Sequence, residues 1–189
     1  MDVDYLLPFS TRQELRAWLA ENSAQKKYCW IAVSMKPAKD TIYYLDAVEE
    51  CLCYGWIDNT RKKLPDGILA QRLAPRVPCS KWSELNKERV RRLEKLGLMT
   101  EQGRRCLPEM SLTAFVIDEE IMTALRSDPQ LYANFLEFPE LYRRVRIDTI
   151  QIKKAQPTLF QSRLNKFLEA TKMKKMYGNW HDQGRLLAY

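Results

Sequence analysis

The sequence has 189 residues, of which 46% are hydrophobic and 29% are charged, and its net charge is +7. This length indicates one domain, or one domain with an appendage, and the apolar content is enough for a hydrophobic core. Six Gly and nine Pro residues are too few for a fibrous or disordered chain. No apolar run approaches the roughly 18–20 residues that span a bilayer. The opening MDVDYLLPF lacks a basic, apolar leader, so we expect a cytoplasmic protein without a transmembrane segment.

The first half of the chain predicts helices packed on a small antiparallel sheet. Thr11 and Glu14 have the spacing of a capping box, and the apolar stripe behind them predicts a helix that ends near Asn22. The aromatic and β-branched run at 28–34 is typical of a strand. The next elements are a helix at about 44–54 that stops at Gly55, and strands at 56–63 and 68–73 joined by the turn Pro65-Asp66-Gly67 as a hairpin.

The second half is predicted to be helical. Ser83 precedes a helix of about 84–96, and Thr100 opens a short one. Residues 108–117 have no clear periodicity and mark the joint. Further helical segments are expected after Asp118, over 131–136 and over 139–154, with a long last helix from Pro157. Within 139–154, the stretch IDTIQIK also suits a strand. We therefore predict an α+β fold with two parts, an α+β domain at 1–108 and a helical, basic C-terminal region at 118–177.

The cysteines and the short motifs suggest neither a metal nor a cofactor. The five cysteines are odd in number and irregularly spaced, and the only histidine is His181. Cys51 and Cys53 form CxC rather than the CxxC of zinc or redox sites, so buried, reduced thiols are the simpler interpretation. No dinucleotide fingerprint, phosphate loop or HExxH motif is present. We expect no metal site and no cofactor.

The positive charge is concentrated near the C-terminus. Residues 143–175 contain ten Lys and Arg residues but only two acidic residues, Asp148 and Glu169. Such a block, interleaved with aromatic residues, is typical of a nucleic-acid-binding surface, although it also suits an anionic membrane, an acidic protein or a merely solvated helix face. The candidate nucleic-acid contacts are Arg143, Arg144, Arg146, Lys153, Lys154, Arg163 and Lys166.

Two motifs of the first part could form one site. The hairpin would bring GWID at 55–58 close to the stiff loop PRVPCSKWS at 75–83. An arginine fork, a hydroxyl group and tryptophan faces suit an anionic or planar ligand. The candidate ligand-binding residues are Trp56, Asp58, Arg76, Ser80, Lys81 and Trp82. The alternative is structural: Asp58 and Arg76 form a salt bridge, both tryptophans are core, and Ser80 or Ser83 caps a helix.

Catalysis receives less support than binding. Asp58 could act as a general acid or base with Lys81 or Tyr54, but the only histidine lies in the tail. Cys79, next to Ser80 and Lys81, is the best candidate nucleophile of the five cysteines, yet the sequence offers it no base. No catalytic residue is identified, and a non-enzymatic protein is the better expectation.

Three segments carry a resemblance to a known family. CLCYGWID at 51–58, APRVPCSKWSELN at 74–86 and GLMTEQG at 97–103 resemble the signature segments of the YdeI/OmpD-associated, or bacteriocin-protection, family. The resemblance covers residues 9–107 closely and 118–175 more loosely. Leu73 stands where the family usually has an aromatic residue, and the usual Thr-Arg-rich start of the tail is only partly matched at 157–163.

The resemblance implies a role in envelope stress and peptide resistance, without an established reaction. Together with the two motifs, it predicts a binding or stress-response protein that protects against bacteriocins or antimicrobial peptides. The predicted partner is an unknown anionic small molecule or peptide held in a pocket at Arg76. The alternative is a nucleic-acid-binding protein that uses the basic C-terminal helices.

Overall fold

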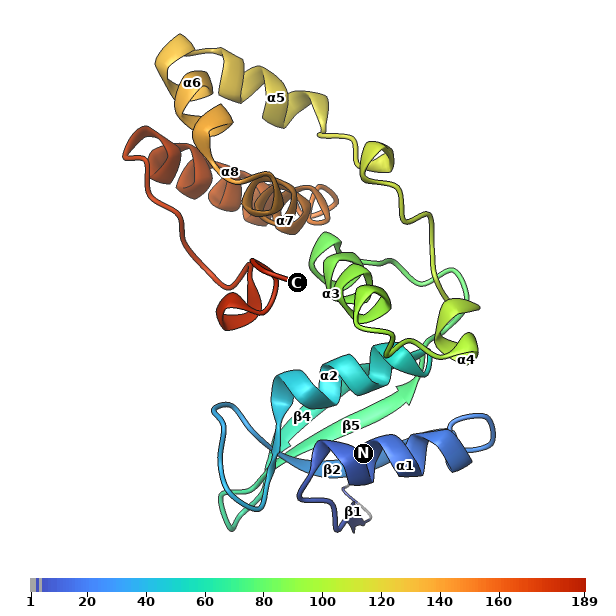
Figure 1. Ribbon diagram of the computed structural model, residues 1–189. Helices are drawn as coiled ribbons and strands as arrows, with labels where there is room; N and C mark the ends of the chain where they lie inside the picture. Colours follow the sequence, from blue (N-terminus) through green and yellow to red (C-terminus); the bar gives the residue numbers. More distant parts are fainter. Residues whose placement is uncertain (1–2, 4) are drawn as a thin grey trace. The chain divides into compact units, whose positions relative to one another are not determined.

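The computed structural model describes residues 3 and 5–189, which fall into two compact units (Figure 1). Unit 1 consists of Met1–Lys81 and Arg89–Pro108, and unit 2 of Trp82–Glu88 and Glu109–Tyr189. Met1, Asp2 and Asp4, at the start of the first predicted domain, lie outside the described residues. The predicted domains at 1–108 and 118–177 stay a prediction, because compactness alone does not establish independent folding.

Within the described residues, unit 1 contains a five-stranded mixed sheet of order β1-β2-β5-β4, with β3 paired to β2. The longer strands β2, β5 and β4 are antiparallel, as predicted, whereas the two-residue strands β1 and β3 run parallel to β2. The α+β class is therefore confirmed, and the sheet is mixed rather than wholly antiparallel. The strands are β1 (Leu6–Leu7), β2 (Cys29–Ser34), β3 (Ile42–Tyr43), β4 (Trp56–Lys63) and β5 (Leu69–Pro75).

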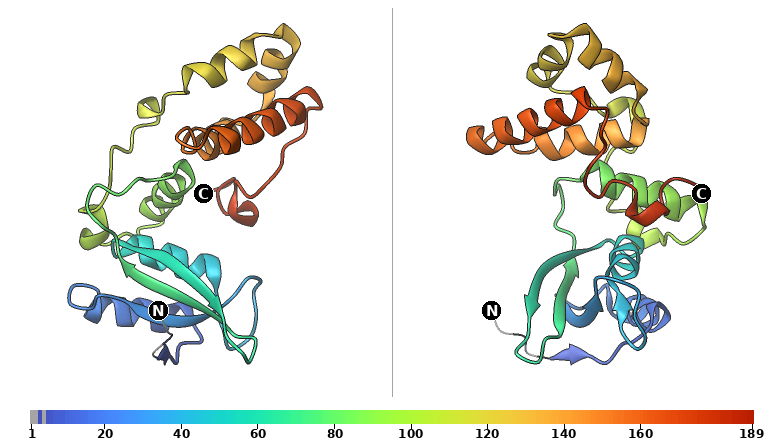
Figure 2. Two further views of the ribbon diagram at one scale, coloured as in Figure 1. Left: turned by 180° about the vertical axis from the view of Figure 1, so that it is seen from behind. Right: turned by 90° about the vertical axis from the view of Figure 1, so that its left-hand side faces the viewer.

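Helices α1 (Arg12–Asn22) and α2 (Tyr44–Cys53) lie on one side of the three longer strands (Figure 2). The predicted capping box of α1 is confirmed, because Thr11 Oγ1 accepts from the Glu14 amide at 3.2 Å and Glu14 Oε2 accepts from the Thr11 amide at 2.9 Å. In β2, residues 29, 30, 31 and 33 are buried. The side chains at 29, 31 and 33 share one face of the strand and give the sheet an apolar surface.

Gly55 lies at the junction between α2 and the β4–β5 hairpin. Its φ of +70° is a conformation that side chains disfavour, which explains why α2 stops there. The short helix α4 (Glu101–Arg104) packs against this junction. A Cβ on its Gly103 would lie 2.2 Å from the Cys53 carbonyl oxygen, so only glycine permits that approach. The predicted hairpin is confirmed, with Trp56 opposite Pro75 and Asp58 opposite Leu73.

The predicted caps confirm the helical character of unit 2. Asp118 and Asp128 cap α5 and α6, Ser83 Oγ accepts from the Asn86 amide at 3.2 Å, and Pro157 opens α8. The helices are α5 (Glu119–Arg126), α6 (Pro129–Glu137), α7 (Glu140–Gln151) and α8 (Pro157–Lys172), with 3₁₀ turns at Leu112–Ala114 and Asp182–Gly184. Helix α3 (Glu84–Lys95) begins in unit 2 and ends in unit 1.

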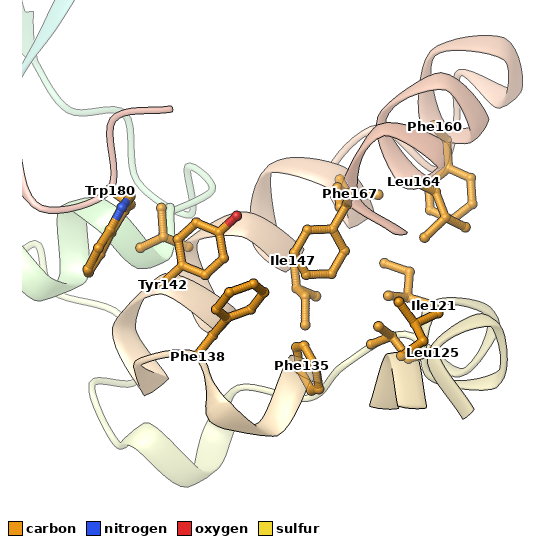
Figure 3. Packing of buried hydrophobic residues seen from close by; sticks show 13 residues of the cluster. Ile121, Leu125, Phe135, Phe138, Tyr142, Ile147, Phe160, Leu164, Phe167 and Trp180 are labelled. Carbon is orange, nitrogen blue, oxygen red and sulfur yellow. The ribbon is translucent and has the colours of Figure 1, made fainter. Parts of the chain in front are cut away.

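The core of unit 2 is rich in aromatic side chains (Figure 3). Tyr142 is fully buried and meets the rings of Phe138 and Trp180 edge to face, at 5.0 and 5.4 Å between centroids. Trp180 follows α8, in a segment for which the sequence predicts no element. Such edge-to-face pairs stabilise a core beyond the area that they bury. None of the helices formed by the described residues is long and apolar enough to cross a membrane.

Candidate functional site

Asp58 extends from β4 toward the start of α2. Its Oδ2 accepts a hydrogen bond from the Tyr44 hydroxyl at 2.5 Å. Burial, and then the Asp58 charge, raise the pKa of Tyr44, so this phenol stays a protonated donor. The Arg61 guanidinium lies 4.7 Å from the centre of the Tyr44 ring, and Arg61 and Arg89 oppose the rise in pKa. Asp58 is therefore a fixed carboxylate with cationic neighbours.

Arg76 is held immediately after β5. Its amide donates to the Gly55 carbonyl at 2.9 Å, and its Nη1 donates to Ser80 Oγ at 3.4 Å. Only 7% of the residue is exposed, and this burial lowers the pKa of Arg76, opposed first by the Asp58 carboxylate. An arginine nevertheless keeps its charge in a protein. The hairpin thus brings Asp58, Arg76 and Ser80 into one polar cluster, as the two motifs suggested.

The other predicted ligand-binding residues are placed differently. Trp56 is 1% exposed, its Nε1 donates to the Ser23 carbonyl at 3.1 Å, and its ring meets Trp18 edge to face at 5.8 Å. Its ring is packed in the core of unit 1, and a ligand-binding role for it stays a prediction. Lys81 is exposed on the loop, and the half-buried Trp82 belongs to unit 2. A ligand-binding role for Asp58, Arg76, Ser80, Lys81 and Trp82 stays a prediction.

Sequence reasoning missed a buried ion-pair network that links α2 to α1 and to Arg92 of α3. Glu49 and Glu50 are each 1% exposed. Arg12 contacts Glu49 at 2.7 Å and Glu50 at 2.5 Å, Arg16 contacts Glu50 at 2.9 Å, and Arg92 contacts Glu49 at 2.9 Å. Burial lowers the pKa of Arg12, but the two carboxylates outweigh it and raise the value. The charges of Glu49 and Glu50 are already balanced by arginines, so we interpret the network as structural.

The cysteines are free thiols, of which those at 29, 51 and 53 are buried. Burial raises the pKa of Cys29 to about 12 and that of Cys53 to about 11, which leaves both thiols protonated and unreactive. Cys79 is exposed, with a φ of +59°. Among residues 3 and 5–189, no group of three or more His, Cys, Asp or Glu side chains could hold a metal ion.

Several basic residues of unit 2 are engaged in contacts within the unit. Arg144 is buried and pairs with Glu84 at 2.9 Å and Glu88 at 3.0 Å. Arg143 lies over the ring of Phe135 at 5.5 Å. Lys154 pairs with Asp118, while Lys153 is half-buried. The charges of Arg144 and Lys154 are therefore balanced inside the unit rather than offered to a polyanion.

Three other cations gather around Tyr177. Arg146 and Lys166 lie 5.3 and 5.1 Å from the centre of its ring. Burial raises the pKa of Tyr177, and the charges of Arg146 and Arg163 oppose that rise. Arg163 is fixed by donating to the Thr149 carbonyl. The fold therefore brings three of the predicted nucleic-acid contacts, Arg146, Arg163 and Lys166, close to one aromatic ring.

Two family models match separate parts of the chain. One, described as "Domain of unknown function (DUF8412)", matches residues 7–106. The other, described as "Bacteriocin-protection, YdeI or OmpD-Associated", matches residues 114–173. The predicted resemblance to the YdeI/OmpD-associated family is therefore confirmed for residues 114–173, where it was looser, whereas residues 7–106 match the other model. No curated protein and no solved structure gave a significant match.

Proposed function

This chain belongs to the family described as "Domain of unknown function (DUF8412)", and we propose that it is a non-enzymatic, cytoplasmic binding protein with an anion-accepting site at Arg76. The similarity of residues 114–173 to the bacteriocin-protection, YdeI or OmpD-associated family supports a role in the response to antimicrobial peptides. The observation that carries the proposal is a buried guanidinium near Asp58, whose Nη1 donates to Ser80 Oγ at 3.4 Å.

The arrangement favours an anion that also carries a hydrogen-bond donor. A guanidinium presents a planar fork of donors that matches a carboxylate or phosphate. Asp58, held by Tyr44, can accept a donor from the same ligand. A peptide carboxylate with a neighbouring N–H, or a hydroxylated small anion, combines both groups. The hydrogen bond from Arg76 Nη1 to Ser80 Oγ orders the fork before binding, which reduces the entropy lost on association.

Removing the Arg76 charge is expected to abolish ligand-induced stabilisation. Thermal unfolding of the whole chain would be followed with inorganic phosphate, triglutamate and trialanine as probes. A ligand at 100 times its Kd stabilises a protein by about 2.7 kcal/mol. We expect a rise in Tm for the wild type with at least one anionic probe, none for Arg76→Gln, and a smaller rise for Arg76→Lys.

Arg105→Gln is the matched control, because Arg105 is an exposed arginine of the same unit, and its ion pair with Glu101 is open to solvent. It should behave as the wild type. If Arg76→Gln folds and keeps the full shift, the site is not at Arg76. If trialanine acts as strongly as the charged probes, the ligand is not selected by its charge.

The cluster around Tyr177 favours a second function, binding of single-stranded nucleic acid. Bases stack on aromatic rings while nearby cations hold the backbone, and this combination tolerates many sequences. Tyr177 is half-buried, with Arg146 and Lys166 close to its ring. This function would be separate from the anion site of unit 1.

The second function predicts a change in salt dependence. For single strands, each neutralised phosphate contributes about 0.7 to the slope of log K against log salt. The double variant Arg163→Gln/Lys166→Gln should therefore reduce the slope by roughly 1.4 in fluorescence-anisotropy titrations with a labelled oligothymidylate. Lys154→Gln, which removes a cation already paired with Asp118, should leave the slope unchanged. Equal slopes for all three proteins, or no binding at low salt, would exclude this interface.

A further inference from the structure

Unit 1 contains a cleft that is separate from the proposed anion site at Arg76. It has a volume of about 390 Å³, and its lining includes Trp18 and Asn22 of α1, Lys26, Tyr28 just before β2, and Trp30 in β2. Ligand pockets typically measure roughly 300–1,000 Å³, so the cleft is large enough for a small molecule. Its described lining residues include none of the six predicted for the site at Arg76.

The aromatic walls of the cleft are held in place by contacts with neighbouring side chains. Trp18 meets Trp56 edge to face at 5.8 Å and lies 6.3 Å from the ring of Phe9. The Arg72 guanidinium lies 4.3 Å from the centre of the Tyr28 ring. Rings held in this way need little ordering when a ligand arrives, and flat walls favour a flat ligand.

Trp30, one of the residues that line the cleft, carries a buried hydrogen-bond donor. The residue is 1% exposed, and its indole Nε1 has no hydrogen-bond partner among the described residues. Buried polar groups are nearly always bonded, so an unpartnered donor on a lining residue can take its acceptor from a ligand. A carboxylate oxygen is a stronger acceptor for such a group than a neutral one.

The described lining of the cleft carries only positive charge. Lys26 is the only charged side chain among its described lining residues, and it is exposed. Cys29 also lines the cleft, but burial raises the pKa of this thiol to about 12, so it does not act as a nucleophile. The lining is suited to reversible binding of an anion rather than to covalent capture.

We propose that this cleft binds a small planar aromatic carboxylate. The ring lies against Trp18 and Tyr28, and the carboxylate is shared between the Trp30 indole N–H and the Lys26 ammonium. The proposal is independent of the anion site at Arg76, because it uses different residues and requires an aromatic ring.

Calorimetric titration of the whole chain with three matched probes tests this inference. The probes are 2-naphthoate, the neutral 2-naphthamide and the non-aromatic cyclohexanecarboxylate. We expect saturable binding of 2-naphthoate and at least about tenfold weaker binding of the other two, the loss expected when a charge-assisted hydrogen bond or a stacking contact is removed. Equal affinity for all three probes, or no saturable binding of 2-naphthoate, would overturn the proposal.

Variants and spectra locate the binding. Lys26→Gln should weaken 2-naphthoate about tenfold, whereas Lys27→Gln, an exposed neighbour outside the lining, should leave it unchanged. In ¹H–¹⁵N spectra of the wild type, the indole resonance of Trp30, assigned with Trp30→Phe, should move downfield on binding. An unmoved Trp30 resonance at saturation would contradict the proposed site. Equal losses of affinity in both lysine variants would contradict it as well, and this outcome does not depend on whether Trp30→Phe folds.

Discussion

Replacing Glu50 by glutamine is expected to lower the free energy of unfolding by about 3 kcal/mol, because removing one member of a buried ion pair leaves its partners uncompensated. Glu50 is 1% exposed and joins Arg12 at 2.5 Å and Arg16 at 2.9 Å. Glutamine has nearly the same shape, so the change is one of charge rather than volume.

The partners of Glu50 determine the size of this effect. Arg12 and Arg16 have side chains that are 25% and 31% exposed, so water relieves part of the loss. Glu49 still holds Arg12 and Arg92, which keeps α1 attached to α2. We therefore expect a weakened native state rather than an unfolded one.

Urea unfolding followed by circular dichroism measures this loss as a lower midpoint at an unchanged slope. Glu101→Gln is the matched control, since its pair with Arg105 has side chains that are 69% and 75% exposed. Exposed pairs contribute about 0–1 kcal/mol, so this control should unfold close to the wild type. A Glu50→Gln midpoint equal to that of Glu101→Gln would show that the network contributes no stability.

Arg144→Gln is expected to cost about 3–4 kcal/mol, again from the loss of a buried charge partner. Arg144 is 7% exposed and joins helix α7 to Glu84 at 2.9 Å and Glu88 at 3.0 Å. Without the guanidinium, two buried carboxylates of α3 lose their shared partner. Urea unfolding would measure the loss, and Arg126→Gln, on the exposed face of α5, should lie within about 0.5 kcal/mol of the wild type.

The same variant separates folding from nucleic-acid binding. Arg144 was predicted as a nucleic-acid contact, but the structure already pairs its charge inside unit 2. At a temperature where Arg144→Gln is fully folded, its affinity for an oligonucleotide should equal that of the wild type. A loss of affinity without a loss of stability would return Arg144 to the binding surface.

The elements with local signals could be predicted from the sequence. The capping box at Thr11, the stop at Gly55 and the hairpin turn each depend on residues only a few positions apart, and the structure contains all three. The strands β1 and β3 have two residues each, too few to show any alternation. Their pairing with β2 is decided by tertiary contacts, which no local pattern encodes.

The candidate site was predictable only in part, for the same reason. The hairpin register brings Asp58 toward Arg76. The proximity of these two residues could be predicted, because the turn between the two motifs is visible in the sequence. The burial of Trp56 depends on Trp18, 38 positions earlier, and the ion pairs of Glu50 depend on the packing of α1 against α2. Alternation indicates which face a residue shares, but it does not indicate whether that face is covered.

The most direct test of the central claim is a phosphate and triglutamate titration of the uniformly ¹⁵N-labelled chain, observed through the arginine Nε–H resonances. We expect the Arg76 resonance, assigned with Arg76→Lys, to shift with a saturable dependence on the anionic probe, while that of Arg105 stays in place. Saturation of the protein with either probe without any movement of the Arg76 resonance would contradict an anion site at this residue.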